Sequence, residues 1–118
     1  MRPSTRLVFI AQLLAVLLAS CSSDSGGRKI DILQTDVGCT PESVPVTAGE
    51  KVTFVVKNNA KNDWELEGIE GAKIEEVLVP SGRSRSINYS VPSTAGTVKV
   101  KCYTPGGAAT IIQIAISQ

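Results

Sequence analysis

The chain has 118 residues, 12 of them basic and 11 acidic, and its formal charge is +1. This length leaves room for one domain, and the balanced charge argues against a nucleic-acid-binding protein. The sequence contains no histidine, and its one methionine is Met1. Histidine-based catalysis, zinc sites with histidine ligands and blue-copper sites built from two His, a Cys and a Met are therefore excluded.

Residues 1–20 have the pattern of an export signal. Two arginines precede an apolar run over residues 7–18. This run is short for a membrane span, which needs about twenty residues. Residues 18–21 read Leu-Ala-Ser-Cys and resemble the lipobox of bacterial lipoproteins. The resemblance implies that the signal is removed and that Cys21 carries a lipid. That lipid would anchor the protein to a membrane of the bacterial cell envelope, with its domain in the periplasm or extracytoplasmic space. A plain secretory signal is the alternative.

Cleavage before Cys21 would leave a mature chain of 98 of the 118 residues. Because two arginines leave with the signal, ten basic side chains remain against 11 acidic ones and the formal charge becomes −1. This charge gives no indication of a polyanionic partner. Residues 21–29 are polar and predict a flexible tether, followed by one domain over residues 30–118. Cys39 and Cys102 remain as an even pair in an oxidising compartment, a setting typical of disulfides.

From Ile30 onward the composition is that of a β protein. This part of the chain has 20 Val and Ile residues against three Leu, with Gly or Pro at short intervals. No segment sustains a helical periodicity. In chain order, strands are predicted over residues 29–35, 43–46, 51–57, 63–67, 72–79, 83–90, 96–102 and 109–116.

Several of these strands alternate between apolar and polar side chains. The alternation is clearest over residues 51–57, apart from Val55, and over residues 96–102. It indicates strands that bury one face. Seven to eight such strands with no helix predict an all-β, antiparallel Greek-key β-sandwich. The same alternation places Cys102 inward, while Cys39 lies at an irregular strand junction that can turn towards the interior.

The order of short sequence signatures resembles cupredoxin domains over nearly the whole mature chain. These signatures are Gly-Cys-Thr-Pro-Glu at 38–42, Val-Pro-Val-Thr-Ala-Gly at 44–49, Val-Thr-Phe-Val-Val-Lys-Asn at 52–58, Asn-Asp-Trp-Glu-Leu at 62–66, Val-Pro-Ser-Gly at 79–82 and Ala-Gly-Thr-Val-Lys-Val-Lys-Cys at 95–102. The Gly-Cys start, the Trp-Glu pair and the late cysteine most resemble the EfeO-type cupredoxin-like family, which accompanies iron-uptake systems. The resemblance implies a cupredoxin-like fold.

The sequence departs from blue-copper cupredoxins at their ligand positions. Asn62 stands near the place of a ligand histidine, and residues 103–108, which follow Cys102, contain neither histidine nor methionine. A blue-copper electron-transfer site is therefore not expected. The EfeO-type resemblance implies instead that two cysteines and carboxylates hold a copper or iron ion. Carried over onto this chain, the site would consist of Cys39, Cys102, Glu65 and one of Glu75 or Glu76.

Each of these residues also has a simpler interpretation. A disulfide between Cys39 and Cys102 would close a loop of roughly 63 residues and stabilise the fold by roughly 4 kcal/mol. The oxidising envelope and the missing histidines favour the disulfide. Glu65 lies in an alternating strand, as a solvent-facing residue would. Glu75 and Glu76 are adjacent and point to opposite faces, so at most one of them could join a site, and both can be surface charges.

Two functions remain open. The first is an accessory metal-binding module in the cell envelope that handles iron or copper for a metal-uptake system, without blue-copper electron transfer. The second is a disulfide-stapled structural or protein-binding lipoprotein that binds no metal. An enzyme is not expected, because the residues supply no nucleophile with an adjacent base.

Overall fold

The structure is a computed structural model that describes residues 27–118. The predicted signal over residues 1–20, the lipidation site Cys21 and most of the tether over residues 21–29 lie outside the described residues. Within residues 27–118, no helix is long and apolar enough to cross a membrane.

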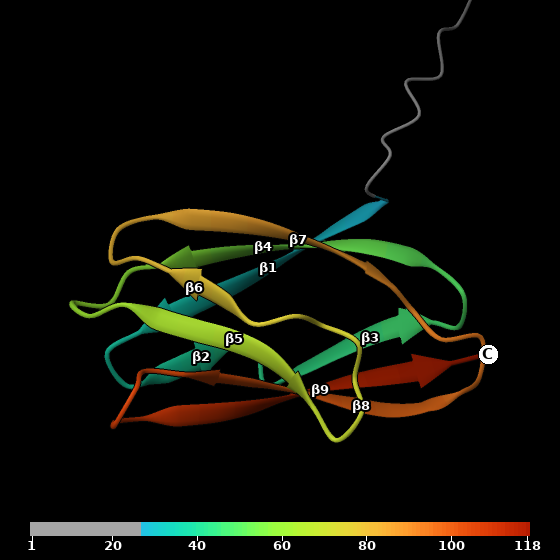
Figure 1. Cartoon of the computed structure of the whole chain (residues 1–118). Coiled ribbons are helices and arrows are strands. Elements are labelled where there is room, and N and C mark those ends of the chain that lie inside the picture. The colour runs from blue at the N-terminus through green and yellow to red at the C-terminus, as the bar shows by residue number, and fades with distance from the viewer. Residues whose placement is uncertain (1–26) are drawn as a thin grey trace, which may run out of the picture.

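The described residues form nine strands in two sheets that face one another (Figure 1). One sheet has four strands in the order β2-β1-β4-β7, and the other has five in the order β3-β9-β8-β5-β6. The strands are β1 (Arg28–Thr35), β2 (Gly38–Thr40), β3 (Ser43–Thr47), β4 (Lys51–Asn58), β5 (Trp64–Ile69), β6 (Val77–Val79), β7 (Ser84–Ser90), β8 (Gly96–Tyr103) and β9 (Ala109–Ser117).

The predicted all-β sandwich is confirmed, with two corrections. The strand count is nine and not seven to eight, because β2 is only three residues long and shows no alternation in the sequence. The pairing is also not wholly antiparallel, since β1 runs parallel to β4 and β3 runs parallel to β9. The chain crosses between the sheets after β2 and again after β3. Such crossovers place strands side by side that point the same way.

The predicted strand over residues 72–79 is wrong in its first half. β6 comprises only Val77–Val79, and the residues before it form a loop. The chain reverses at Glu70 and Gly71, whose φ angles are 54° and 86°. Ile74 is buried from within this loop. Its place in an apolar alternation therefore reflects contact with the core and not pairing in a strand.

The inward faces of the two sheets pack into one core. The inward face predicted for β4 is observed, because Val52, Phe54 and Val56 are each 1% exposed or less. The opposite face is not wholly solvated, since Thr53 is only 7% exposed. The ring of Phe54 stacks on Tyr89 of β7, with the ring centroids 6.0 Å apart. Trp64 of β5, also 1% exposed, packs inward from the opposite sheet. Burial of apolar surface, worth about 25 cal/mol per Å², holds the two sheets together.

Candidate functional site

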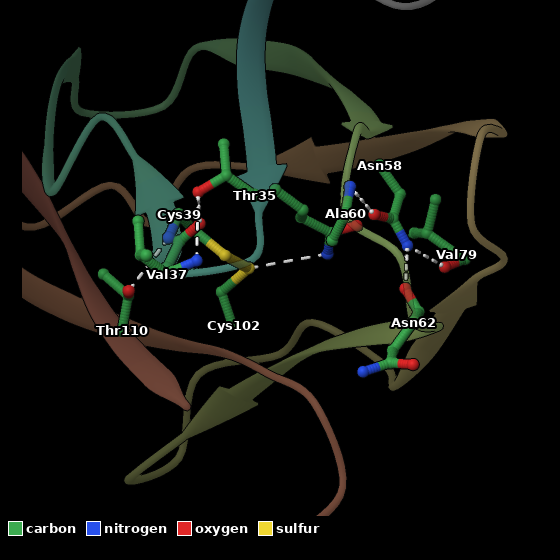
Figure 2. The surroundings of a disulfide bond; sticks show 11 residues. Thr35, Val37, Cys39, Asn58, Ala60, Asn62, Val79, Cys102 and Thr110 are labelled. Atoms are coloured by element: carbon green, nitrogen blue, oxygen red, sulfur yellow. Dashed lines mark hydrogen bonds between the residues drawn. A yellow bond between two sulfur atoms is a disulfide. The ribbon is translucent and has the colours of Figure 1, made fainter. Parts of the chain in front are cut away.

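A disulfide joins the two sheets at one end of the sandwich. Cys39 of β2 and Cys102 of β8 are bonded through their sulfur atoms, and their Cα atoms lie 6.3 Å apart. The two residues are only 2% and 0% exposed. Figure 2 shows the sulfur–sulfur bond among side chains that come from both sheets. Cys102 lies inward, in the same parity as buried Val100, as the alternation predicts.

The backbone around Cys39 fits closely against the opposite sheet. The Cys39 N–H donates a hydrogen bond of 2.9 Å to Oγ1 of Thr110 at the start of β9 (Figure 2). A Cβ atom added at the preceding residue, Gly38, would lie 2.7 Å from the same hydroxyl oxygen. Glycine permits this approach because it has no side chain. The Gly-Cys pair therefore brings Cys39 close to β8 and β9.

Gln34 of β1 is the buried polar neighbour of the disulfide. Its side chain is 0% exposed, and its Nε2 group donates a hydrogen bond of 3.5 Å to Cys102 Sγ. Its Oε1 atom is buried and has no hydrogen-bond partner among the described residues. In the β1–β2 pairing Gln34 stands directly opposite Cys39. One amide thus lies beside both cysteines with its acceptor unused.

Asn58 of β4 is the second buried amide at this end of the sandwich, and it is fully paired. It stands beside Gln34 in the parallel β1–β4 register. Its Nδ2 group donates to the carbonyl oxygens of Asn62 and Val79, each at 2.9 Å, and its Oδ1 accepts from the Ala60 N–H at 2.7 Å (Figure 2). These bonds tie the loop after β4 to the end of β6. Asn58 therefore has a structural role that accounts for its burial.

The three predicted carboxylates do not lie with the cysteines. Glu65 alternates with buried Leu66 on β5, and Leu66 is the residue that pairs with Cys102. Because successive side chains of a strand point to opposite faces, Glu65 lies on the outer face of its sheet while Cys102 points into the core. Glu75 and Glu76 are exposed in the loop before β6. The carboxylate part of the implied ligand set is therefore separated from its cysteine part.

The outer face of the five-stranded sheet carries its own group of charges. Glu65 stands opposite Tyr103 in the β5–β8 pairing, and its hydrogen bond with the phenol raises the pKa of Tyr103 well above its ordinary value. Repulsion from Glu65 also raises the pKa of Glu76. The Lys101 ammonium lies 4.4 Å from the ring centroid of Tyr103. This group is solvated and lies across the sheet from the disulfide.

The residues do not fit a blue-copper centre. The sequence contains no histidine, and the sulfurs of Cys39 and Cys102 are bonded to one another, so neither is a thiolate in this form. Within residues 27–118, no group of three or more His, Cys, Asp or Glu side chains is placed to hold a metal ion. What the buried end of the sandwich does offer is the Cys39–Cys102 disulfide and the unpaired amide oxygen of Gln34.

Gln34 was not among the residues predicted from the sequence, although a signal was present. Ile30, Ile32 and Gln34 share one parity of β1, so a polar side chain ends an inward-facing apolar series. A buried glutamine at such a position needs partners for both ends of its amide. The direct pairing with Cys39 could not be read from the sequence, because β2 was not predicted.

The two-layer sandwich, with a buried cysteine near the end of β8, has the architecture of a cupredoxin-like domain. The family model described as "Cupredoxin-like domain" matches residues 8–109. The chain therefore belongs to this family. No curated protein matches the chain.

Solved structures with this fold include copper proteins. Reduced auracyanin from Roseiflexus castenholzii has a TM-score of 0.63 at 15% identity, over 79% of this chain and 99% of that one. Auracyanin A, a blue copper protein from Chloroflexus aurantiacus, has a TM-score of 0.60 at 20% identity, over 75% and 98% of the two chains. A copper-containing nitrite reductase from Thermus scotoductus has a TM-score of 0.62 at 14% identity, over 76% of this chain and 31% of that one. These likenesses establish the fold alone.

Proposed function

We propose that the protein is an accessory metal-binding module of the bacterial cell envelope that handles copper or iron without blue-copper electron transfer. In this proposal a lipid on Cys21 anchors the domain to a membrane. The EfeO-type resemblance supports a partner in a metal-uptake system, and the residue inventory supports neither an enzyme nor a nucleic-acid-binding role. The copper proteins among the solved structures support copper as the ion.

One observation carries the metal-binding proposal: two cysteines from opposite sheets meet in the core next to an unpaired amide oxygen. Cys39 and Cys102 lie within bonding distance, and Gln34 contacts Cys102 from β1. When the disulfide is reduced, the pair becomes two potential thiolates, which favour copper(I). The Gln34 Oε1 atom beside them is a potential neutral ligand for the metal ion. The proposed donor set leaves out Glu65, because this side chain lies on the opposite face of the sheet.

The disulfide itself favours a second candidate function. It links β2 to β8 across the core, and both cysteines are at most 2% exposed. A permanent bond of this kind would stabilise a small sandwich whose function is to bind another envelope protein. In that case Cys39 and Cys102 would hold no metal at any stage.

Metal titration of both redox forms distinguishes the two candidates. The full-length protein is purified in detergent without reductant, its free thiols are counted, and copper(I) or iron(II) is added to the oxidised and reduced forms. We expect the reduced form alone to bind copper(I) at micromolar concentrations or below. Cys102→Ser should abolish binding, and the matched surface variant Glu65→Gln should leave it unchanged. A reduced protein that binds neither ion would refute the metal-binding function in favour of the structural one.

Membrane anchoring is tested separately. Wild-type and Cys21→Ala proteins are expressed in a bacterial host, and membrane and soluble fractions are compared. The proposal requires the wild type to be in the membrane fraction and the variant to be released or left unprocessed. Equal distribution of the two proteins would rule out the lipid anchor without affecting the metal assay.

A further inference from the structure

The unpaired oxygen of Gln34 is an unfavourable feature of the oxidised protein. A buried acceptor without a hydrogen bond loses its solvation and gains nothing in return. Gln34 Nε2 already donates to Cys102 Sγ at 3.5 Å, so the amide is oriented by the disulfide while its Oε1 has no donor among the described residues. A disulfide carries no hydrogen on either sulfur and cannot supply that donor.

We propose that Cys39–Cys102 is a redox-active disulfide and that Gln34 favours its dithiol form. A dithiol reductant, of the protein or small-molecule class, supplies two electrons and two protons. The sulfur–sulfur bond breaks, each cysteine gains one hydrogen, and the reductant becomes a disulfide. A thiol can donate a weak hydrogen bond, which a disulfide cannot. An S–H group of Cys39 or Cys102 can then donate to Gln34 Oε1, so the unfavourable burial is relieved only in the reduced state.

The position of Cys39 provides a route for the reductant. Cys39 lies in β2, which is three residues long and forms the edge of its sheet. Within the described residues only β1 pairs with it as a strand, through positions 38–40, and the Cys39 N–H also donates to Thr110 Oγ1 of β9. Short edge elements open locally at a lower free energy than the whole fold. Local opening of β2 would expose the sulfur of Cys39 to thiol attack while β1, β4 and the core stay folded.

The redox state of the disulfide would regulate the metal site proposed above, so this role rests on the proposed function. Only the dithiol form offers thiolates to a metal ion, so reduction would turn binding on and oxidation would turn it off. The redox behaviour can nevertheless be measured with no metal present. Failure of one idea is therefore distinguishable from failure of the other.

The test compares the reduction equilibrium of wild type with that of a variant lacking the amide. Full-length wild type, Gln34→Leu and Thr110→Val are equilibrated with mixtures of reduced and oxidised dithiothreitol, and thiols are alkylated and counted by mass. We expect the equilibrium constant for reduction to fall about tenfold in Gln34→Leu, a shift of about 30 mV for this two-electron couple. Thr110→Val perturbs the other side of Cys39 and should change the constant less than about twofold.

A second variant covers the case in which Gln34→Leu does not fold. Gln34→Met keeps an unbranched chain of similar length, and its stability is measured by urea unfolding in the oxidised and reduced forms. The proposal requires the substitution to raise the free energy of unfolding of the oxidised form relative to that of the reduced form. The size of this change should equal the free energy that corresponds to the shift in the reduction equilibrium. An unchanged reduction constant in the folded Gln34 variants, or an equal shift in Thr110→Val, would overturn it. If the reduced protein binds copper(I) but the Gln34 variants have an unchanged reduction constant, the proposed function is supported and the role of Gln34 is refuted.

Discussion

Removal of the disulfide should cost a large share of the stability of the domain. Cys39 and Cys102 are separated by 63 residues in the sequence, and closing a loop of that length in the unfolded chain is worth about 4 kcal/mol at 25 °C in the chain-entropy model. A domain of this size has a total free energy of unfolding of about 5–15 kcal/mol. The disulfide therefore accounts for a quarter or more of the total.

The double variant Cys39→Ala/Cys102→Ala tests this magnitude without leaving a free thiol. Urea unfolding without reductant should show a free energy of unfolding lower than that of wild type by about 4 kcal/mol, and the melting temperature should fall by about 15–30 °C. Reductant is the matched control, because it should destabilise wild type and leave the double variant unchanged. A loss below about 1 kcal/mol with an unchanged dependence on urea would refute the loop-closure reasoning.

Three further predictions concern other residues. Asn58→Ala removes three hydrogen bonds, two of them buried and one partly buried, and should lower the free energy of unfolding by about 2–4 kcal/mol in urea titrations. A loss under about 1 kcal/mol would contradict the pairing seen in the structure. The hydrogen bond from Arg28 holds the pKa of Glu50 below its ordinary value. This pair should therefore stabilise the fold above the ordinary pKa of the carboxyl and lose its contribution as the pH falls through the lowered pKa. Arg28→Gln should flatten the decline in melting temperature over this acidic range. Repulsion from Glu65 is the largest cause that raises the pKa of Glu76. Glu76→Gln should therefore stabilise the protein slightly at pH 7. The gain should disappear in acid, where Glu76 is protonated, and melting curves at neutral and acidic pH would show this.

The alternation of side chains along β8 predicted the inward orientation of Cys102, whereas the structure does not bring together the ligand set that the family resemblance implied. The resemblance grouped Glu65 with Cys102 as ligands of one ion. The local pattern placed Cys102 inward but left two interpretations of Glu65, a metal ligand and a solvent-facing residue. The structure separates the two side chains, with Cys102 in the core and Glu65 on the outer face of the sheet. Because side-chain direction in a strand follows from the backbone geometry of the strand itself, it is available from the sequence.

Elements without a sustained pattern could not be predicted. β2 has three residues, too few to show a period, and it was assigned to an irregular junction. Ile74 occupies an apolar alternating position but is buried from a loop, since the reversal at Glu70 and Gly71 carries the chain back against the core. In both cases contacts with distant strands outweigh the local preference.

The sequence by itself determined the β class, the inward orientation of Cys102 and the absence of a blue-copper ligand set. These follow from residue types and from the two-residue period of a strand, which are local properties. Only the tertiary structure decided that Cys39 bonds to Cys102 and that Gln34 lies beside them with an unpaired oxygen. That meeting depends on the packing of the two sheets, which places β2 of one sheet against β8 of the other although the two cysteines are 63 residues apart in the sequence. No local pattern encodes such a contact, because its geometry exists only once both sheets have formed.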